Sequence, residues 1–439
     1  MYFAYSLLLC AGLVLAAPYY LWRMRRKKVL PHWRERLGFL PPSMQQAEGG
    51  AIWVHAVSVG ETLAVVGLVQ ELQRNYPSRK VFLSHVTAAG REAGEHRLPH
   101  VAGRFYLPLD WVCAVRRALA RIRPALLVIV ETELWPNLLH TARTCGCRVV
   151  VVNARLSDRS FRRYCLVRPF MRRVLENVDR VCAQTSTDAE RFRTIGAAPD
   201  RVTTTGNLKF DSRPPKPGDF ARRLRDAIGA VPRRPVLVAA STMPGEEPLV
   251  LEAWDEVRRK FPQGLLVLAP RHPERFEGVA RLLVDSQRSM VRRADIETAA
   301  PGLIAQLRSP EILLLDSIGE LAGLFEVADV VFVGGTLVPT GGHNLLEPAY
   351  WGKPIIFGPH MHNFRDVAKL FLDEAAAVQV QSARELGQAL LALLHDEKRS
   401  HELGGRARKL LEREGGATAR VINQIREILG TEAAVRAKA

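Results

Sequence analysis

The feature that most limits the fold is a regular alternation of short apolar runs with longer amphipathic stretches. The runs are rich in Val, Ile, Leu and Ala, and turn residues bound them. Such alternation is typical of βαβ units, in which helices bury a parallel sheet on both faces. We therefore predict an α/β fold with strands at 52–57, 81–85, 126–130, 149–152, 181–183, 236–239, 265–269, 312–315, 330–333 and 355–357.

A proline-rich segment divides this alternation into two halves. Residues 211–218 read Asp-Ser-Arg-Pro-Pro-Lys-Pro-Gly, which can neither continue a helix nor join a central strand. A chain of 439 residues with 47% apolar residues has material for two hydrophobic cores. We predict two Rossmann-like domains that face each other across a cleft, at 23–211 and 219–439, joined by a linker at 212–218.

The N-terminus predicts a membrane anchor. The first 22 residues carry no charged side chain, and five of the next six are Arg or Lys. This length is just sufficient to cross a bilayer, and charge after the apolar stretch argues against a cleaved secretory signal. The positive-inside rule then places the rest of the chain in the cytoplasm. We predict a single-pass transmembrane anchor at residues 1–22 in the inner (plasma) membrane.

The net charge of +17 indicates anionic partners. Membrane lipids and phosphorylated small molecules suit it, whereas we find no zinc-finger spacing, RNP-like motif or long basic tail and predict no nucleic-acid partner. Six cysteines without CxxC or zinc-knuckle spacing indicate unpaired thiols in a reducing compartment. His343, His360 and His362 lack a completing carboxylate or cysteine, and we predict no structural metal.

Residues 331–348 combine a strand, a glycine-dense loop and a helix start. The apolar Val-Phe-Val runs into Gly-Gly-Thr-Leu-Val-Pro-Thr-Gly-Gly-His and then Asn-Leu-Leu-Glu-Pro. Glycine lets backbone N–H groups approach an anion, and a helix N-terminus adds partial positive charge, so the segment suits a nucleotide. Asn-x-x-Glu is also an ordinary capping box, and the residues alone leave the two interpretations balanced.

Acidic residues follow two other predicted strands, at the sheet edge where doubly wound folds bind ligands. Glu61, at a glycine turn, is our candidate general base, although Ser58-x-x-Glu61 is equally consistent with a helix cap. Glu131 and Glu133 lie two apart, so a continuing strand would place them on one face and raise one pKa. A salt-bridged structural pair is the alternative.

Basic groups offer further candidates, each with a plain structural alternative. Arg271, between prolines after a strand, suits a bidentate grip on phosphate or is a surface arginine. Lys209, just before the linker, would neutralise anionic charge or be solvated. Ser317 and Glu320 repeat the capping-box ambiguity. The arginine-rich stretch 162–173 is a solvated helix face or a contact for anionic lipid headgroups.

Six motifs spread over almost the whole chain form a highly specific combination. They are 55–62 (His-Ala-Val-Ser-Val-Gly-Glu-Thr), 131–137 (Glu-Thr-Glu-Leu-Trp-Pro-Asn), 153–157 (Asn-Ala-Arg-Leu-Ser), 206–211 (Gly-Asn-Leu-Lys-Phe-Asp), 270–273 (Pro-Arg-His-Pro) and 341–348 (Gly-Gly-His-Asn-Leu-Leu-Glu-Pro). Together they resemble the 3-deoxy-D-manno-octulosonic acid (Kdo) transferases of lipopolysaccharide assembly.

The resemblance implies a membrane-anchored GT-B glycosyltransferase that moves Kdo from the donor substrate CMP-Kdo to a lipid A precursor (lipid IVA) with inversion. It implies Glu61 as proton acceptor, with Glu131 and Lys209 supporting the transition state. The donor carries one phosphate, so the need for a divalent ion is weak, and no cofactor is expected. Partners would be CMP-Kdo, the lipid A precursor and inner-membrane lipids. The implied CMP-binding residues are Pro270, Arg271, Ile318, Gly319, Glu320, Asn344, Leu345, Leu346 and Glu347.

The chain also departs from the family's pattern. Residues 241–247 read Ser-Thr-Met-Pro-Gly-Glu-Glu where the family has Ser-Thr-His-Glu-Gly-Glu-Glu. Thr340 and Leu345 stand where a larger polar residue and a proline are common. Two alternatives follow: a GT-B transferase or epimerase that uses a different nucleotide sugar, or an inactive membrane-tethered lipid-binding module if Met243 and Pro244 mark lost chemistry.

Overall fold

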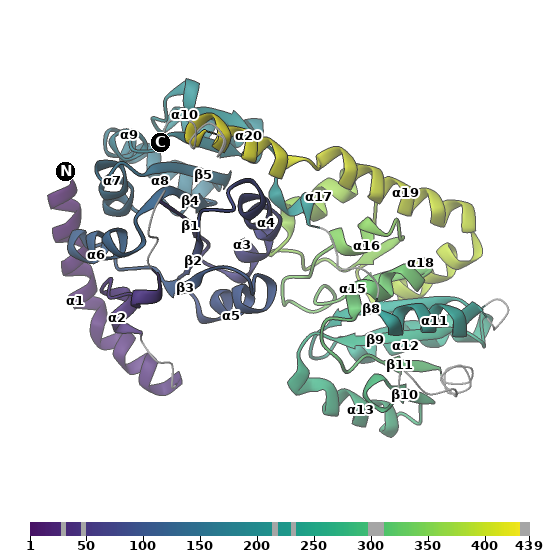
Figure 1. Ribbon diagram of the computed structural model, residues 1–439. Helices are drawn as coiled ribbons and strands as arrows, with labels where there is room; N and C mark the ends of the chain where they lie inside the picture. The colour runs from purple at the N-terminus through teal and green to yellow at the C-terminus, as the bar shows by residue number, and fades with distance from the viewer. Residues whose placement is uncertain (28–31, 45–49, 213–217, 230–233, 297–310, 431–439) are drawn as a thin grey trace. The chain divides into compact units, whose positions relative to one another are not determined.

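The computed structural model describes residues 1–27, 32–44, 50–212, 218–229, 234–296 and 311–430. These form two compact units: the first contains Met1–Ser212 and Glu414–Ala439, and the second contains Arg213–Arg413. Each unit is built around a seven-stranded sheet whose described strand pairs are all parallel (Figure 1). The predicted α/β fold with two Rossmann-like halves is confirmed. The predicted linker falls mainly on residues 213–217, outside the described residues.

The first sheet has the strand order β3-β2-β1-β4-β5-β6-β7. Its side chains alternate between two cores, since Ala51 and Trp53 of β1 enter one core and Ile52 and Val54 enter the other. Both faces are therefore covered. The strands are β1 (Ala51–His55), β2 (Val81–His85), β3 (Gly103–Tyr106), β4 (Pro124–Val130), β5 (Arg148–Ala154), β6 (Arg180–Ala183) and β7 (Val202–Thr204).

Helices cover the two faces of this sheet as separate layers. Figure 1 shows α3, α4 and α5 on one side of the strands and α6 and α7 on the other. The helices of the first unit are α1 (Tyr2–Lys27), α2 (Trp33–Arg36), α3 (Val59–Ala64), α4 (Val66–Asn75), α5 (Ala88–Arg97), α6 (Val112–Ile122), α7 (Pro136–Thr144), α8 (Asp158–Leu166), α9 (Arg168–Leu175), α10 (Ser186–Thr194) and α20 (Ala417–Leu429).

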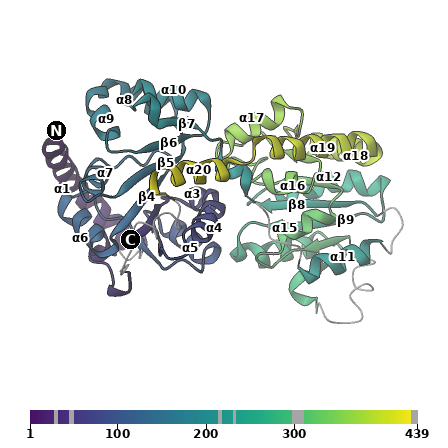
Figure 2. The same ribbon diagram turned by 45° about the horizontal axis from the view of Figure 1, so that its top comes forward.

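The position of α20 corrects the predicted domain boundary at 219–439. This C-terminal helix lies against α4 and β5 of the first unit (Figure 2). Its apolar residues Val421, Ile422 and Ile425 are buried in the core that also contains Leu68 and Leu72 of α4. The backbone N–H groups of Gly416 and Thr418 donate to the Asp211 carboxylate, which fixes the start of the helix. The amphipathic pattern of α20 indicates a helix, but it carries no information about which sheet the helix covers.

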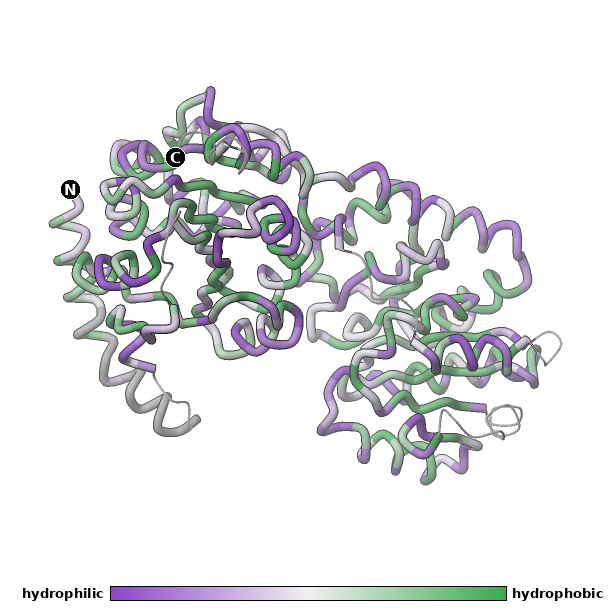
Figure 3. Tube along the Cα trace, in the orientation of Figure 1, coloured by the Kyte–Doolittle hydropathy of each residue, from purple (hydrophilic) through white to green (hydrophobic). Residues whose placement is uncertain are grey.

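The second sheet has the order β10-β11-β9-β8-β12-β13-β14. Trp254 of α12 is fully buried in its core, beside Leu386 and Leu390 of α18. Figure 3 shows apolar colour along the strands and mainly hydrophilic colour along α19. The elements are β8 (Val236–Thr242), β9 (Leu265–Pro270), β10 (Met290–Arg292), β11 (Ile312–Leu314), β12 (Val330–Val333), β13 (Ile355–Phe357), β14 (Val378–Gln379), α11 (Asp219–Gly229), α12 (Glu247–Lys260), α13 (Phe276–Asp285), α15 (Leu321–Leu324), α16 (Leu346–Tyr350), α17 (Arg365–Asp373), α18 (Ala383–His395) and α19 (Glu397–Glu414).

Every strand predicted from an apolar run is present in one of the two sheets. The strands that the pattern missed are β3, β7, β10 and β14, which are the edges of the two sheets. An edge strand is short and is buried less completely than a central strand, so it lacks a continuous apolar run. For example, β10 is only Met-Val-Arg, and all three residues are partly exposed.

The predicted transmembrane anchor is not supported. Residues 2–27 do form one helix, α1, but among the described residues no helix has both the length and the apolar character needed to cross a membrane. One face of α1 contacts the rest of the first unit. The Tyr2 ring stacks on His140 with centroids 4.3 Å apart, its hydroxyl accepts a bond from Asn177, and Ser6 accepts a bond of 2.9 Å from Asn137.

Candidate functional site

Each sheet has one point where the order of the strands reverses. In the first sheet it lies between β1 and β4, and in the second it lies between β8 and β12. The chain leaves the two strands at such a point in opposite directions, so the loops after them leave a crevice where ligands bind in α/β folds. Glu61 and Glu131 follow β1 and β4, and the glycine-dense loop of residues 334–343, here called the glycine run, follows β12. Each set of candidates therefore lies at the switch point of its own unit.

Glu61 forms the capping box that the sequence offered as the alternative to catalysis. Ser58 is the N-cap of α3, and its Oγ accepts from the Glu61 N–H. In return, the Glu61 carboxylate accepts from the Val57 N–H at 2.8 Å and from Ser58 Oγ at 2.9 Å. This cap fixes the carboxylate at the end of β1 and does not exclude proton transfer.

The surroundings of Glu61 change its acidity. Burial raises the pKa of Glu61 to about 7, and the negative charges of Glu131 and Glu133 add to the rise. The two capping bonds oppose this shift because they favour the ionised form. A carboxyl group with a pKa near neutrality can accept a proton at physiological pH and release it again, which is the property required of a general base.

Glu131 and Lys209 lie together although they follow different strands. Glu131 Oε1 lies 3.8 Å from Lys209 Nζ, and both side chains are about a quarter exposed (27% and 24%). The expectation that Glu131 and Glu133 share a strand face is wrong, because β4 ends at Val130 and Glu131 has a φ of +59°. Burial raises the pKa of Glu133, and Glu131 contributes to that rise.

A buried asparagine that the sequence analysis did not single out positions the lysine segment. Asn153, fully buried with a φ of +53°, accepts from the Leu208 N–H at 3.0 Å. Asn207 then accepts from the Lys209 N–H at 3.0 Å. A polar residue next to the end of an apolar strand was the available signal, and Asn153 opens one of the six motifs.

His85 supports the loop before Glu61 from within the core. Its Nδ1 lies 2.9 Å from the Ala56 carbonyl oxygen, and the residue is fully buried. Burial lowers the pKa of His85 to about 4, so the ring is neutral and donates from Nδ1. The ring therefore contributes a hydrogen bond to this loop and no charge.

In the second unit, the backbone of the glycine run binds a carboxylate of the protein itself, that of Glu246. The N–H groups of Gly335, Thr336 and Leu337 donate to the Glu246 carboxylate at 2.6, 2.9 and 2.9 Å. The expectation that glycine-loop amides face a nucleotide anion is therefore wrong for these three. The sequence pattern could not identify the acceptor, because Glu246 follows β8 and meets the run only when β8 and β12 pair.

Arg271 lies beyond the end of β9, next to the glycine run. Its side chain is exposed and makes no ion pair with the described residues, while its N–H donates to the Thr242 carbonyl at 3.0 Å. Pro270 is the last residue of β9. Burial, together with the positive charge of Arg271, lowers the pKa of His343 to about 4. An uncommitted guanidinium at the carboxyl end of a parallel strand suits an anionic ligand.

The turn at Ile318–Glu320 offers less than the resemblance implied. Ile318 is 80% exposed, and Gly319 has a φ of +89°. Both oxygens of the Glu320 carboxylate accept from Arg293 at 2.9 Å, and Ser317 donates to it as well. This acid is committed to a bidentate ion pair, so it would meet a nucleotide only through competition with Arg293.

The Asn344–Glu347 segment presents alternating polar and buried side chains. Asn344 Oδ1 accepts from the Leu346 N–H at 3.1 Å, and its Nδ2 donates to Glu347 at 3.3 Å. Leu345 and Leu346 are buried, at 0% and 2% exposure. These leucines can contribute only backbone groups to a ligand, whereas Asn344 and Glu347 are partly exposed and can contribute side chains.

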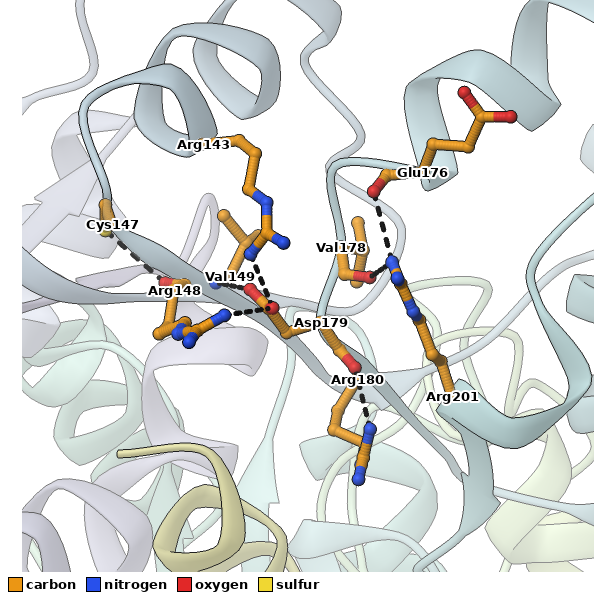
Figure 4. Close-up of polar contacts among 9 residues, drawn as sticks. All are labelled: Arg143, Cys147, Arg148, Val149, Glu176, Val178, Asp179, Arg180 and Arg201. Carbon is orange, nitrogen blue, oxygen red and sulfur yellow. Dashed lines mark hydrogen bonds and ion pairs between the residues drawn. The ribbon is translucent and has the colours of Figure 1, made fainter. Parts of the chain in front are cut away.

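Several arginines of the basic surplus serve the fold. Asp179 accepts from Arg143 at 2.6 Å, from Arg148 at 3.1 Å and from the Val149 N–H at 2.9 Å (Figure 4). Arg201 donates to the carbonyl groups of Glu176 and Val178 in the same view. This cluster lies at the N-terminal ends of β5 and β6, opposite the edge that carries Glu61, so we assign it no part in the candidate site.

Comparisons with known proteins agree with these motifs. Residues 31–212 match the family described as 3-deoxy-D-manno-octulosonic-acid transferase (kdotransferase). The chain is 32% identical over 406 residues to the 3-deoxy-D-manno-octulosonic acid transferase of Haemophilus influenzae, covering 91% of this chain and 92% of that protein. It is 37% identical over 388 residues to the Bordetella pertussis protein of the same name, covering 86% and 87%.

Among solved structures, the chain resembles the UDP-GlcNAc 2-epimerase from Neisseria meningitidis, with a TM-score of 0.57 and 12% identity over 86% of this chain and 100% of that one. At such low identity the likeness concerns the fold alone. The identity and coverage of the sequence relatives decide the family. The chain belongs to the Kdo transferase family of glycosyltransferases, and its two parallel-sheet units are those of the GT-B fold.

Proposed function

We propose that the chain transfers Kdo from CMP-Kdo to a lipid A precursor, lipid IVA, with Glu61 as the general base and with inversion. Family membership supports the reaction class. The observation that carries the assignment of the base is a buried acid at the β1–β4 switch point, with a pKa of about 7, next to the Glu131–Lys209 pair.

The proposed step is a single displacement. Glu61 removes the proton from an acceptor sugar hydroxyl, and the hydroxyl oxygen forms a bond to the anomeric carbon of Kdo. The bond from that carbon to CMP breaks, and CMP leaves with the electron pair. Attack on the face opposite CMP inverts the anomeric centre. Lys209, held beside Glu131, supports the transition state by offsetting negative charge as it develops.

On the donor side, we propose that the second unit binds the CMP part through the loops that follow the carboxyl ends of β9, β11 and β12. Arg271 is the group best suited to the phosphate, because its guanidinium is exposed and unpaired among the described residues. Asn344 and Glu347 offer polar side chains, and Leu345 and Leu346 offer backbone groups. Pro270 and the turn of Ile318, Gly319 and Glu320 complete the proposed donor set.

We further propose that the first unit works at an anionic membrane surface. Phe3, Leu7 and Leu8 of α1 are exposed, at 81%, 61% and 71%. Leu166, the last residue of α8, and Val167, which precedes α9, are exposed too, and the same two helices carry several exposed arginines. Tyr2 and Tyr5 connect these regions through ring contacts with Phe170. Apolar side chains flanked by arginine suit the interface of an anionic bilayer, where a lipid A precursor is found.

The test is transfer by the purified full chain. CMP-Kdo and lipid IVA are incubated with the protein, and mass spectrometry of the lipid follows the added Kdo mass. The expected product is Kdo-modified lipid IVA, and Glu61→Gln should form it about 10²–10⁴-fold more slowly while still binding CMP. A thermal-shift titration should show stabilisation by CMP and not by UDP. Stabilisation by UDP with no transfer from CMP-Kdo would instead support a different nucleotide sugar.

A further inference from the structure

Glu246 is a fully buried carboxylate that has no ion-pair partner among the described residues. Its four contacts are backbone N–H groups. Oε1 accepts from Thr336 and Leu337, each at 2.9 Å, and Oε2 accepts from Gly335 at 2.6 Å and Met243 at 3.1 Å. Three of these donors belong to the glycine run, and the fourth belongs to the loop after β8. The carboxylate therefore ties together the two loops at the switch point of the second sheet.

Burial of a carboxylate without a cation is costly, and the amide donors offset that cost only while they all point at it. Burial raises the pKa of Glu246, and the four N–H groups oppose the rise. The space around the carboxylate is closely filled. A Cβ at Gly334 would lie 2.8 Å from both Glu246 Oε2 and the Ser241 carbonyl oxygen. The contact therefore holds the loop in one conformation.

The effect of this contact continues through Gly335 to the candidate donor residues. Gly335 has a φ of +68°, and its carbonyl accepts from the Gly342 N–H at 2.8 Å and from Thr340 Oγ1 at 3.0 Å. The His343 ring lies beside it, since a Cβ on Gly335 would come within 3.0 Å of the imidazole. Residues 340–343 lead directly into Asn344. Glu246 thus fixes one end of a chain of contacts whose other end is in the proposed CMP site.

We propose that Glu246 is a positioning residue for donor binding, which holds the glycine run so that residues 341–347 meet the CMP part of the donor. This inference rests on the proposed function for the identity of the ligand. Glu246 itself touches no substrate in this proposal, and its carboxylate occupies amides that would otherwise be open to an anion. The glycine run consequently meets the nucleotide through its later residues and not through the amides of Gly335, Thr336 and Leu337.

The test uses the full chain and two matched variants. Glu246→Gln preserves the shape of the side chain but replaces one carboxylate oxygen by an NH2 group. This group cannot accept from the N–H groups that face it, so the hydrogen bonds to that oxygen are lost. Glu311→Gln is the control, because Glu311 is also buried in the second unit but precedes β11 at the opposite edge of the sheet, paired with Arg258 and Arg288. CMP affinity is measured by calorimetry, and the KM values for CMP-Kdo and lipid IVA are measured separately.

Glu246→Gln should weaken CMP binding at least tenfold and raise the donor KM in parallel, with the acceptor KM unchanged. Glu311→Gln should lower the melting temperature but keep CMP affinity within twofold of wild type. A folded Glu246→Gln that binds CMP like wild type would overturn the proposal. If Glu246→Gln does not fold, Thr340→Val decides instead, since it removes only the bond to Gly335. Unchanged CMP affinity in that variant would also reject the proposed chain of contacts.

A second readout separates this inference from the proposed function. Amide hydrogen exchange at Gly335, Thr336 and Leu337 needs no nucleotide, and it should be slow in wild type and at least tenfold faster in Glu246→Gln. Fast exchange in the wild-type protein would reject the role of Glu246. Slow exchange with no CMP binding by the wild-type chain would leave the Glu246 contact intact and reject the nucleotide assignment.

Discussion

Glu131 Oε1 and Lys209 Nζ lie 3.8 Å apart, although Glu131 follows β4 and Lys209 follows β7. The backbone sets this pairing. Glu131 turns out of the strand with a positive φ, and Asn153 holds the Leu208 N–H beside it. Both side chains are partly exposed, so the attraction alone stabilises the fold little, typically by about 0–1 kcal/mol. We therefore attribute to this pair the role in transfer that we propose above.

We predict that Glu131→Gln and Lys209→Met each reduce the transfer rate at least tenfold while the melting temperature changes little. If the pair acts as a unit, the double variant should lose no more than the more severe single variant. Steady-state kinetics with a double-mutant cycle measures this. Lys369→Met is the control, since Lys369 also pairs with an acid, Asp373, but on the exposed face of α17. Additive losses would show that the two residues act independently.

The pKa of about 7 for Glu61 predicts the pH dependence of the reaction. Only the carboxylate can accept a proton, so kcat/KM should rise with pH through about 7 and then level off. Glu61→Gln should lose about 10²–10⁴-fold in rate and lose this dependence. Ser58→Ala should move the midpoint upward, because the Ser58 hydrogen bond lowers the pKa. Ser157→Ala, which removes the equivalent cap of α8, should leave the midpoint in place.

The raised pKa of Glu61 also predicts that the stability of the protein falls as the pH rises, whereas kcat/KM rises. The pKa of Glu61 in the folded protein is about 7, above the ordinary value of 4.5, so folding favours the protonated form. Its stabilising contribution is complete below pH 4.5 and is lost as the pH rises through about 7. The free energies of unfolding of wild type and Glu61→Gln, measured with denaturant across this window, should converge at low pH. Near pH 8 the variant should be the more stable protein. An identical pH profile for the two proteins would contradict the shift.

Two nearby arginines should behave differently when they are replaced. Arg271 makes no ion pair with described residues, so Arg271→Ala should weaken CMP binding by about tenfold or more and change stability little. Arg275 binds the buried Glu247 through two bonds of 2.7 and 2.8 Å, so Arg275→Ala should cost about 3–5 kcal/mol of stability. Calorimetry with CMP and chemical denaturation measure the two effects. Equal loss of stability in both variants would reject the distinction.

Removal of α20 should destabilise the first unit and not the second. Residues 1–212 alone would expose the core surface that Val421, Ile422 and Ile425 cover. We predict that this fragment aggregates or melts early, and that a fragment joining 1–212 to 414–439 through a short linker is soluble and melts cooperatively. Circular dichroism and size-exclusion chromatography measure both properties. A stable 1–212 fragment would show that α20 is dispensable.

Membrane binding should depend on the exposed apolar residues of α1 and on lipid charge. The full chain should sediment with vesicles that contain anionic phosphatidylglycerol and much less with neutral phosphatidylcholine vesicles. Phe3→Asp combined with Leu7→Asp should reduce binding several-fold without changing the melting temperature, since both side chains are exposed. Val284→Asp, on exposed α13 of the second unit, is the matched control. Equal loss in the control would point to a general surface effect.

The sequence by itself determined the central strands, the two α/β units and the family. A buried parallel strand must be apolar on both faces, so its residues are visible without a partner, and the motifs at strand ends are local. Edge strands such as β10 escaped because their burial is incomplete. The sequence also placed Glu61 and Arg271 at strand ends, since short loops fix a residue relative to its strand.

Only the tertiary structure decided which groups meet. Glu246 and Gly335 come together because β8 pairs with β12, and Glu131 meets Lys209 because the ends of several parallel strands lie at one edge. The C-terminal helix covers the first sheet for the same kind of reason, since an amphipathic face specifies burial but not against what. Hydrogen bonds between loops distant in the sequence leave no periodic pattern. For that reason the glycine run, taken from the sequence alone, suggests an open nest for an anion, whereas in the structure the Glu246 carboxylate already accepts its N–H groups.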